Sequence, residues 1–419
     1  MNLIAADGEV WRKHRRVMGP AFNGKLYDLV WKETLDTYRE MVSAEGWLGK
    51  SSVEIPAVQR LTFKPPRASN GRFTIQEALQ IVTERNLLLS VLPKWARLRI
   101  PFFGMRRTME AFDLMTEFMH SQVQERKREI HTKGEEDLES DVFTMLVRAN
   151  EDEGSKLKLE DDELVSYALD FIDQKFKPHA DIKIGNVWSL LFAGHETTAH
   201  TLAATIGHLA VHEVIQADVH KHIIDVIGDD PQPSPESYSK LEKVLAVFYE
   251  ALRLYPAGHI LIREASEDTV LDIPKPHGQE GNITIPVEKG VQVSLNFFRV
   301  GQSSNLYLPL KVIVDMVGVQ YNPRYFDEPE KFKPSRWCGV PAESEIFSAF
   351  SIGARACLGR KFAIVESICF LTMLLRDYKV EPLLLPNETR DQWAKRVLDA
   401  KLVITLGIKD VPVRLVSRK

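Results

Sequence analysis

The ten residues FSIGARACLG, Phe350 to Gly359, place one cysteine in a turn bounded by glycines. A thiolate is a strong metal ligand when it is kept deprotonated, and a helix beginning just after Cys357 would stabilise the negative charge with its N-terminus. Gly353 and Gly359 would let the backbone approach a flat ligand. Phe350 would cover the sulfur, and Arg355 would hold an anionic group of the same ligand. A lone cysteine is usually a structural core residue, but the joint fit of these five positions favours metal ligation.

The composition is that of a folded protein. The chain has 419 residues, of which 44% are hydrophobic and 27% charged, and its net charge of -4 gives no indication of nucleic-acid binding. Three irregularly spaced cysteines, Cys338, Cys357 and Cys369, argue against a disulfide framework or a zinc site and favour a reducing compartment. No stretch approaches the roughly 20 apolar residues that span a bilayer.

Hydrophobic periodicity predicts a single, mainly α-helical domain over residues 1–419 with small β-sheets. Short strands are expected over 269–287, where the sequence alternates around proline and glycine. Helices are expected at 24–46, 74–90, 106–130, 141–150, 184–211, 241–254 and 356–378.

The cysteine stretch resembles the haem-binding loop of the cytochrome P450 superfamily, the haem-thiolate monooxygenases, whose pattern is F-x-x-G-x-R-x-C-x-G. The resemblance implies the P450 fold and haem b as cofactor, with Cys357 as the axial thiolate ligand of the iron. It places Phe350, Gly353, Arg355 and Gly359 at the cofactor. It also implies insertion of one oxygen atom from O2 into a lipophilic small molecule. Because the sequence has no flavin or nicotinamide fingerprint, electrons would come from a separate NADPH–cytochrome P450 reductase.

The motif AGHETT, residues 193–198, lies in the middle of the longest expected helix and matches the family pattern [AG]-G-x-[DE]-T-[TS]. Glycine inside a helix costs about 1 kcal/mol relative to alanine. Threonine hydroxyls can also bond to carbonyls four residues earlier, so Gly194 and the two threonines are expected to loosen the helix and open a groove. The resemblance implies that Ala193 lies at the cofactor. It also implies that Glu196 and Thr197 relay protons to bound dioxygen. An ordinary polar helix stripe is the alternative for the motif taken alone.

Two further motifs predict a structural cluster. Glu250 and Arg253 in EALR share one helix face, which by default describes a solvated pair. The segment FKPSRW resembles the family segment whose arginine, here Arg336, completes a buried Glu-Arg-Arg cluster. Removing one member of such a cluster would leave an unpaired buried charge.

Basic residues near the N-terminus and in the predicted strand region complete the implied cofactor site. Trp11 and Arg15 in WRKHR match the family's W-x-x-x-R, whose side chains meet a haem propionate. Arg263 resembles a second arginine that binds a propionate. The alternative for both arginines is a surface position.

Two surface features bear on partners. The basic surface near Arg12, Lys13 and Arg16 would help to dock an acidic electron donor. Residues 86–107 mix apolar and basic side chains with Trp95, which suits either peripheral membrane contact or a core segment with a basic rim. The family resemblance implies the cytoplasmic face of the endoplasmic reticulum. Because this chain shows no anchor, the cytosol is the alternative.

The sequence departs from the family pattern in three ways. One is that the helix beginning VQRLTF is cut short by KPPRASNGRF, whose two prolines cannot continue it. The usual N-terminal anchor and the first strands and helices are expected to be missing before Trp11. Residues 165–183 and 293–311 fit nothing in the family; each is 19 residues long, begins Val-Ser and ends in Lys. Val-Ser can be encoded GTAAGT, an intron start, and Lys can be AAG, an intron end. Both segments are therefore interpreted as retained introns of a fungal gene, with genuine surface loops as the alternative.

Three functions remain open from the sequence. The first is a monooxygenase of secondary metabolism or detoxification. The second is a haem-thiolate isomerase or dehydratase, against which the intact Glu196-Thr197 pair argues. The third is an inactive haem-binding product of a misread gene.

Overall fold

In the computed structural model, the described residues fall into seven segments, some with short gaps. They are residue 3, residues 6–58, 74–82 without 76 and 80, 105–132, 141–151, 186–290 without 264, 266, 276 and 277, and 312–418 without 342–346, 403, 404 and 409. The segments 165–183 and 293–311 lie wholly outside the described residues. Residues 86–104 and most of the helix expected at 74–90 also lie outside them.

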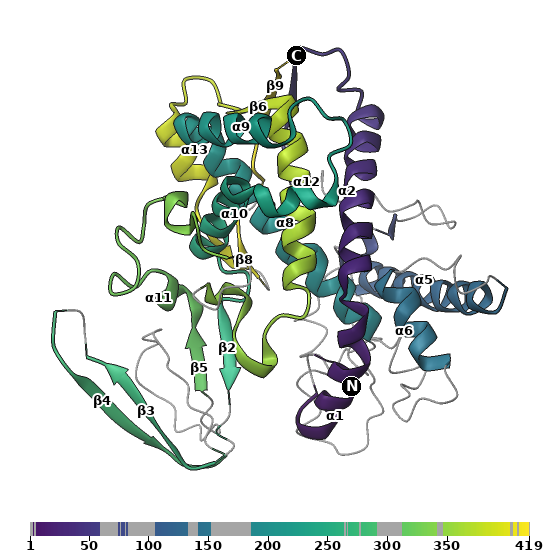
Figure 1. The fold of residues 1–419 in the computed structure, drawn as a ribbon, viewed down its shortest axis with the longest axis vertical. Helices are drawn as coiled ribbons and strands as arrows, with labels where there is room; N and C mark the ends of the chain where they lie inside the picture. The colour runs from purple at the N-terminus through teal and green to yellow at the C-terminus, as the bar shows by residue number, and fades with distance from the viewer. Residues whose placement is uncertain are drawn as a thin grey trace.

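Helices make up most of the described chain (Figure 1). They are α1 (Gly8–Met18), α2 (Gly24–Ala44), α5 (Met105–Thr132), α6 (Val142–Glu151), α8 (Asn186–Val211), α9 (Glu213–Ile227), α10 (Glu242–Leu254), α11 (Met316–Gln320), α12 (Arg360–Asp377) and α13 (Arg390–Val397). Short 3-10 turns include η5 (Pro235–Lys240), η6 (Pro334–Trp337), η7 (Ser348–Phe350) and η8 (Gly353–Arg355).

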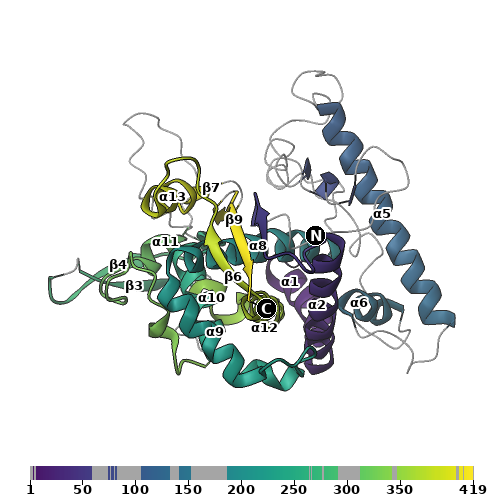
Figure 2. The ribbon, with the colours of Figure 1, turned by 90° about the horizontal axis from the view of Figure 1, so that it is seen from above.

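The strands form small antiparallel sheets. One sheet has the order β1 (Ser52–Ile55), β9 (Val413–Ser417) and β6 (Tyr378–Pro382), with Ser52 opposite Val416 and Tyr378 opposite Ser417. The other pairs are β2 (Ile260–Arg263) with β5 (Val312–Asp315), β3 (Thr269–Pro274) with β4 (Asn282–Val287), and β7 (Lys401–Leu402) with β8 (Leu406–Gly407). The mainly helical fold with minor sheet is confirmed. The short strands expected over 269–287 are present as well and pair into a hairpin, which extends from the body in Figures 1 and 2.

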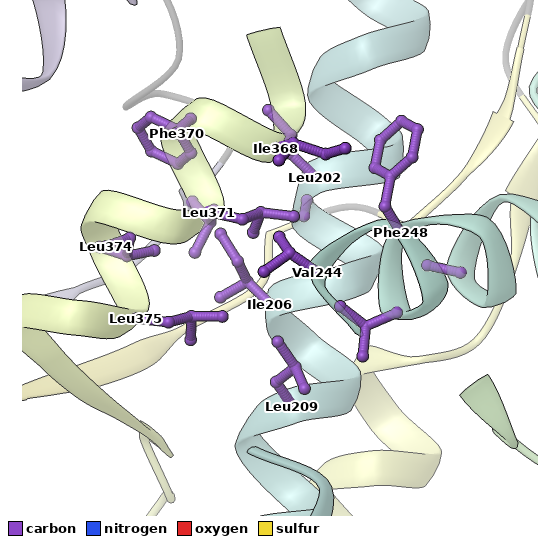
Figure 3. Packing of buried hydrophobic residues seen from close by; sticks show 14 of the residues in the cluster. Leu202, Ile206, Leu209, Val244, Phe248, Ile368, Phe370, Leu371, Leu374 and Leu375 are labelled. Atoms are coloured by element: carbon purple, nitrogen blue, oxygen red, sulfur yellow. The ribbon is translucent and has the colours of Figure 1, made fainter. Parts of the chain in front are cut away.

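The main core lies around α12, α8 and α10. Residues of α12 are buried on nearly all sides between Ile364 and Arg376, as expected of a central helix. α2 runs beside α12 in both overall views (Figures 1 and 2). Figure 3 shows how the apolar side chains meet: Leu202, Ile206 and Leu209 of α8, Val244 and Phe248 of α10, and Ile368, Leu371 and Leu375 of α12.

A second apolar cluster joins α1, α5, α6 and the first half of α8. Met115 and Met119 of α5 are almost fully buried in it. Leu358, the neighbour of Cys357, and Leu190 of α8, one turn before Gly194, both pack against this cluster. The same packing therefore positions the cysteine loop and the AGHETT segment.

The last long helix begins later than its periodicity predicts. Its expected range starts at residue 356, but α12 begins at Arg360, with Gly359 as its N-cap. The amide of Cys357 instead donates to the carbonyl oxygen of Phe350, 2.9 Å away, and closes a loop. Hydrophobic spacing continues through this loop because Leu358 faces the second cluster, which explains the misplaced boundary.

Candidate active site

The loop from Phe350 to Gly359 holds its cysteine by backbone hydrogen bonds. Besides the bond from Cys357 to Phe350, the amide of Ala356 donates to the carbonyl of Gly353 at 3.0 Å. Gly353 has a φ of 74°, a left-handed conformation that favours glycine. The loop then leads directly into the N-terminus of α12, as the sequence predicts for a thiolate site.

The Cys357 thiol is exposed to solvent on one side while packed protein surrounds its other sides. This burial raises the pKa of the thiol. The backbone N–H of Gly359 and the positive charges of Arg15 and Arg360 act in the opposite direction. A coordinating metal ion deprotonates a thiol outright, so the protein supplies an accessible sulfur with donors and positive charge ready for its anionic form.

Two predicted arginines reach this loop from other segments, and the loop itself carries a third. Arg15 of α1 donates through Nη1 to the carbonyl of Ala356, at 3.3 Å. Arg263, the last residue of β2, donates through Nη2 to the hydroxyl of Ser351 at 3.0 Å. The guanidinium of Arg355 lies over the ring of Trp11, with 4.4 Å from Cζ to the ring centroid. The structure thus brings together the basic residues of three distant segments.

Arg355 is also engaged by the N-terminal segment. Its Nη2 lies 2.8 Å from a carboxylate oxygen of Asp7 and 2.9 Å from the carbonyl of Ala6. Asp7 is 96% exposed, so water screens this ion pair and it contributes little to stability. Arg355 can therefore exchange this partner for another anion at small cost.

The AGHETT segment lies within α8. Thr197 Oγ1 donates to the carbonyl oxygen of Ala193 at 2.6 Å, the bond to the fourth preceding residue that the motif predicts. The helix is nevertheless continuous from Asn186 to Val211, so the expected loosening does not interrupt it. Glu196 is half-buried beside Thr197. The continuity follows because the hydroxyl adds a bond to the Ala193 carbonyl without displacing the helical amide.

Space beside three site glycines fits a flat ligand. Apart from the glycine's own chain neighbours and, at Gly194, the surrounding helix backbone, no described atom lies within 4 Å of the position that a Cβ would take at Gly194, Gly353 or Gly359. A soft sulfur ligand, three guanidinium groups and open backbone surfaces are the donor set that a haem with two carboxylate side chains requires. Among the described residues, no group of three histidine, cysteine or acidic side chains could hold a metal ion by itself.

A separate buried cluster surrounds Glu250, which with Arg253 is fully buried. Both nitrogens of the Arg253 fork lie 2.9 Å from the carboxylate oxygens, and Arg336 Nε lies 3.1 Å from Oε1. Two donors complete the shell: the amide of Lys333 at 2.9 Å and Trp337 Nε1 at 2.8 Å. The structure therefore brings Glu250, Arg253 and Arg336 together in a network away from solvent.

Sequence reasoning missed two residues that contact the predicted arginines. Asp7 pairs with Arg355, and Ser351 accepts a hydrogen bond from Arg263. Neither has a spacing signal, because both contacts join segments more than 80 residues apart in the chain. On α1, Arg12 and Arg16 are exposed and Lys13 is half-buried.

The fold and this loop define a haem-thiolate protein, and comparison with known proteins assigns its family. The cytochrome P450 family model matches residues 1–309 and 310–402. The chain belongs to the cytochrome P450 family, whose cofactor is haem bound through a cysteine thiolate, and it is an oxidoreductase of the monooxygenase class. This family uses O2, a redox partner and a lipophilic substrate.

Its relatives come from fungi and animals, among other organisms. Cytochrome P450 monooxygenase 124 of Postia placenta is 30% identical, over 97% of this chain and 74% of the relative. Cytochrome P450 monooxygenase prx9 of Penicillium rubens is 23% identical, over 90% of this chain and 68% of the relative. Probable cytochrome P450 4d21 of Drosophila melanogaster is 25% identical, over 91% of this chain and 72% of the relative. No helix among the described residues combines the length and apolar character needed to cross a membrane.

Proposed function

We propose that this chain inserts one oxygen atom from O2 into a lipophilic small molecule, with Cys357 as the axial ligand of haem b. The observation that carries the proposal is the arrangement at Cys357. An accessible thiol lies at the start of α12, the Gly359 amide bonds to its sulfur, and Arg15 is near enough to act on its charge. Burial raises the pKa of the thiol, while the Gly359 amide and the Arg15 charge favour the thiolate, the form that binds iron.

Residues around the loop would hold the cofactor. The cofactor's carboxylates would be bound by Arg15, Arg263 and Arg355. The ring of Trp11, over which the Arg355 guanidinium lies, would keep that group in place. Phe350 would shield the sulfur, while Gly353 and Gly359 leave room for the porphyrin plane. When bound, haem supplies redox chemistry at its iron, where a thiolate ligand favours cleavage of the O–O bond.

On α8, Glu196 and Thr197 would move protons, and Ala193 would lie against the cofactor. The Thr197 hydroxyl now donates to the Ala193 carbonyl. A small rotation about χ1 would release it, and the adjacent Glu196 carboxyl group, after taking up a proton from solvent, would replace the proton that the hydroxyl gives up. The packing of Leu190 and Leu358 against one cluster supports this pairing of the helix with the cysteine loop.

We further propose NADPH–cytochrome P450 reductase as the electron donor, with the exposed Arg12 and Arg16 and half-buried Lys13 of α1 as part of its docking surface. The endoplasmic reticulum, with peripheral membrane contact through residues 86–107, is the proposed location. A role in secondary metabolism or detoxification fits the fungal monooxygenases among the relatives.

The two segments 165–183 and 293–311 are proposed to be retained introns within a single domain. The family match is divided between residues 309 and 310, inside the second segment, which supports this interpretation. Sequencing the messenger RNA from the native organism decides the matter: a shorter transcript lacking both segments is expected, and a transcript that always encodes both would refute the proposal.

The monooxygenase reaction can be tested with the purified chain, a reductase, NADPH and O2. Lipophilic compounds that perturb the haem spectrum should gain one oxygen atom, seen by mass spectrometry. Thr197→Ala should consume NADPH but yield less product and more hydrogen peroxide, because proton delivery is impaired. Product that forms without NADPH or O2, gains no oxygen atom and is unchanged in Thr197→Ala would instead favour an isomerase or dehydratase.

A further inference from the structure

Ser351, between Phe350 and the glycine turn, has a strained backbone. Its φ is 62° and its ψ is 171°. This region of conformational space is essentially restricted to glycine, because a Cβ there crowds the backbone. Strain of this kind persists only where the surrounding structure enforces it, and it gathers at functional sites.

Neighbouring hydrogen bonds enforce the conformation. The amide of Ser351 donates to the carbonyl of Ser348 at 2.8 Å, and the next bond in the loop joins Cys357 to Phe350. The backbone on both sides of Ser351 is therefore fixed, and the residue cannot relax without opening the cysteine loop.

The side chain of Ser351 has a specific partner. Its hydroxyl accepts a hydrogen bond from Arg263 Nη2, at 3.0 Å, across 88 positions of the chain. Glycine would adopt the same backbone without strain, but it would lack this hydroxyl. A serine here retains the strain and gains a contact that fixes the guanidinium of Arg263.

We propose that Ser351 is a positioning residue that orients Arg263 toward an acidic substituent of the haem bound at the cysteine loop. The inference rests on the proposed placement of the haem at Cys357. A guanidinium fixed at one nitrogen keeps its other donors directed, so less freedom is lost when an anion binds. Without the hydroxyl, Arg263 would bind the same anion more loosely.

The test compares Ser351→Ala, which keeps the strain and loses the hydroxyl, with Ser351→Gly, which loses both. Transfer of haem to excess apomyoglobin measures its dissociation rate. Both variants should release haem about tenfold faster than wild type, the effect of one charge-assisted hydrogen bond. Ser348→Ala, on the same loop but bonded to Gln320, is the matched control and should release haem at nearly the wild-type rate.

Two further measurements separate positioning from general damage to the loop. In an Arg263→Gln background, Ser351→Ala should add little to the rate of haem release, because the two residues act as one unit. Ser351→Gly should unfold at a higher temperature than Ser351→Ala, because only glycine relieves the strain. Wild-type haem retention in both Ser351 variants, additive effects with Arg263→Gln, or equal unfolding temperatures would overturn the proposal.

The carbon monoxide spectrum distinguishes this failure from that of the proposed function. Ser351 variants should keep the thiolate-haem band, because Cys357 is intact. If Cys357→Ser kept the band, the haem placement itself would be wrong; if the band behaved as expected but haem release were unchanged, only the role of Ser351 would be wrong.

Discussion

Replacing Glu250 with glutamine should remove much of the stability of this protein. The carboxylate accepts five hydrogen bonds: two from Arg253, one from Arg336, one from the Lys333 amide and one from Trp337 Nε1. An amide presents one oxygen and two N–H donors. On one side, its N–H donors would therefore face the N–H groups that now donate to the carboxylate. It also leaves the buried Arg253 without its counter-charge.

The expected magnitude follows from burial. Breaking a fully buried ion pair by removing one partner costs about 3–5 kcal/mol, and Glu250 and Arg253 are both 0% exposed. Arg253 keeps bonds to the carbonyls of Gln320 and Pro329, at 2.8 and 2.7 Å, which places the loss toward the lower end of that range. Total stabilities are about 5–15 kcal/mol, so a large share would be lost.

Urea unfolding, followed by circular dichroism, measures the change. Glu242→Gln is the matched control, because Glu242 is exposed on the same helix α10 and should change stability by no more than about 0.5 kcal/mol. A loss below about 1 kcal/mol for Glu250→Gln would refute the reasoning, since it would mean that the buried network tolerates an unpaired guanidinium.

Two other predictions concern the region where α8 meets the C-terminal strands and α10. Burial lowers the pKa of His208 to about 3, and its ring stacks on Phe332 and lies 3.2 Å from the Tyr255 hydroxyl. Below pH 6.5 the unfolded chain binds a proton at His208 that the folded chain does not, so this contribution to stability is complete above pH 6.5 and falls toward pH 3. Urea unfolding should show a loss of about 2 kcal/mol by pH 5. An equal loss in His208→Phe would contradict this assignment. Gly407→Ala would place a Cβ 2.6 Å from the His200 ring, so it should break the 3.0 Å contact of His200 with Thr405 and cost about 1–3 kcal/mol, seen as a lower midpoint of thermal unfolding. An unchanged midpoint would show that the ring can move aside freely.

Local patterns predicted the helices well where one face is consistently apolar. α2 and α10 begin and end within two residues of their expected ranges, because their buried residues repeat at helical spacing and Pro256 follows α10. Periodicity failed at the start of α12, where Leu358 continues the apolar pattern although the backbone is a loop. An apolar side chain in a turn and one in a helix look the same in sequence.

The sequence did not predict which residues of distant segments contact one another, except where a family motif indicated the contact. The Glu250 network could be anticipated from EALR and FKPSRW, but its two further donors depend on where η6 packs. The strained φ of Ser351 and the pairing of Asp7 with Arg355 carry no composition or spacing signal. They arise only when distant segments converge on the cysteine loop.

The central claim is that Cys357 holds the haem iron as a thiolate, and the carbon monoxide difference spectrum of the reduced protein tests it most directly. The wild-type chain should show the absorption band of a thiolate-ligated haem. Cys357→Ser should lose it, because an alcohol is not a soft anionic ligand at neutral pH. Cys369→Ser should keep it, because Cys369 is buried in α12 with its sulfur 3.5 Å from the carbonyl of Trp31, and Cys338→Ser should keep it as well. A wild-type spectrum of histidine-ligated haem, or loss of the band in Cys369→Ser with retention in Cys357→Ser, would contradict the account.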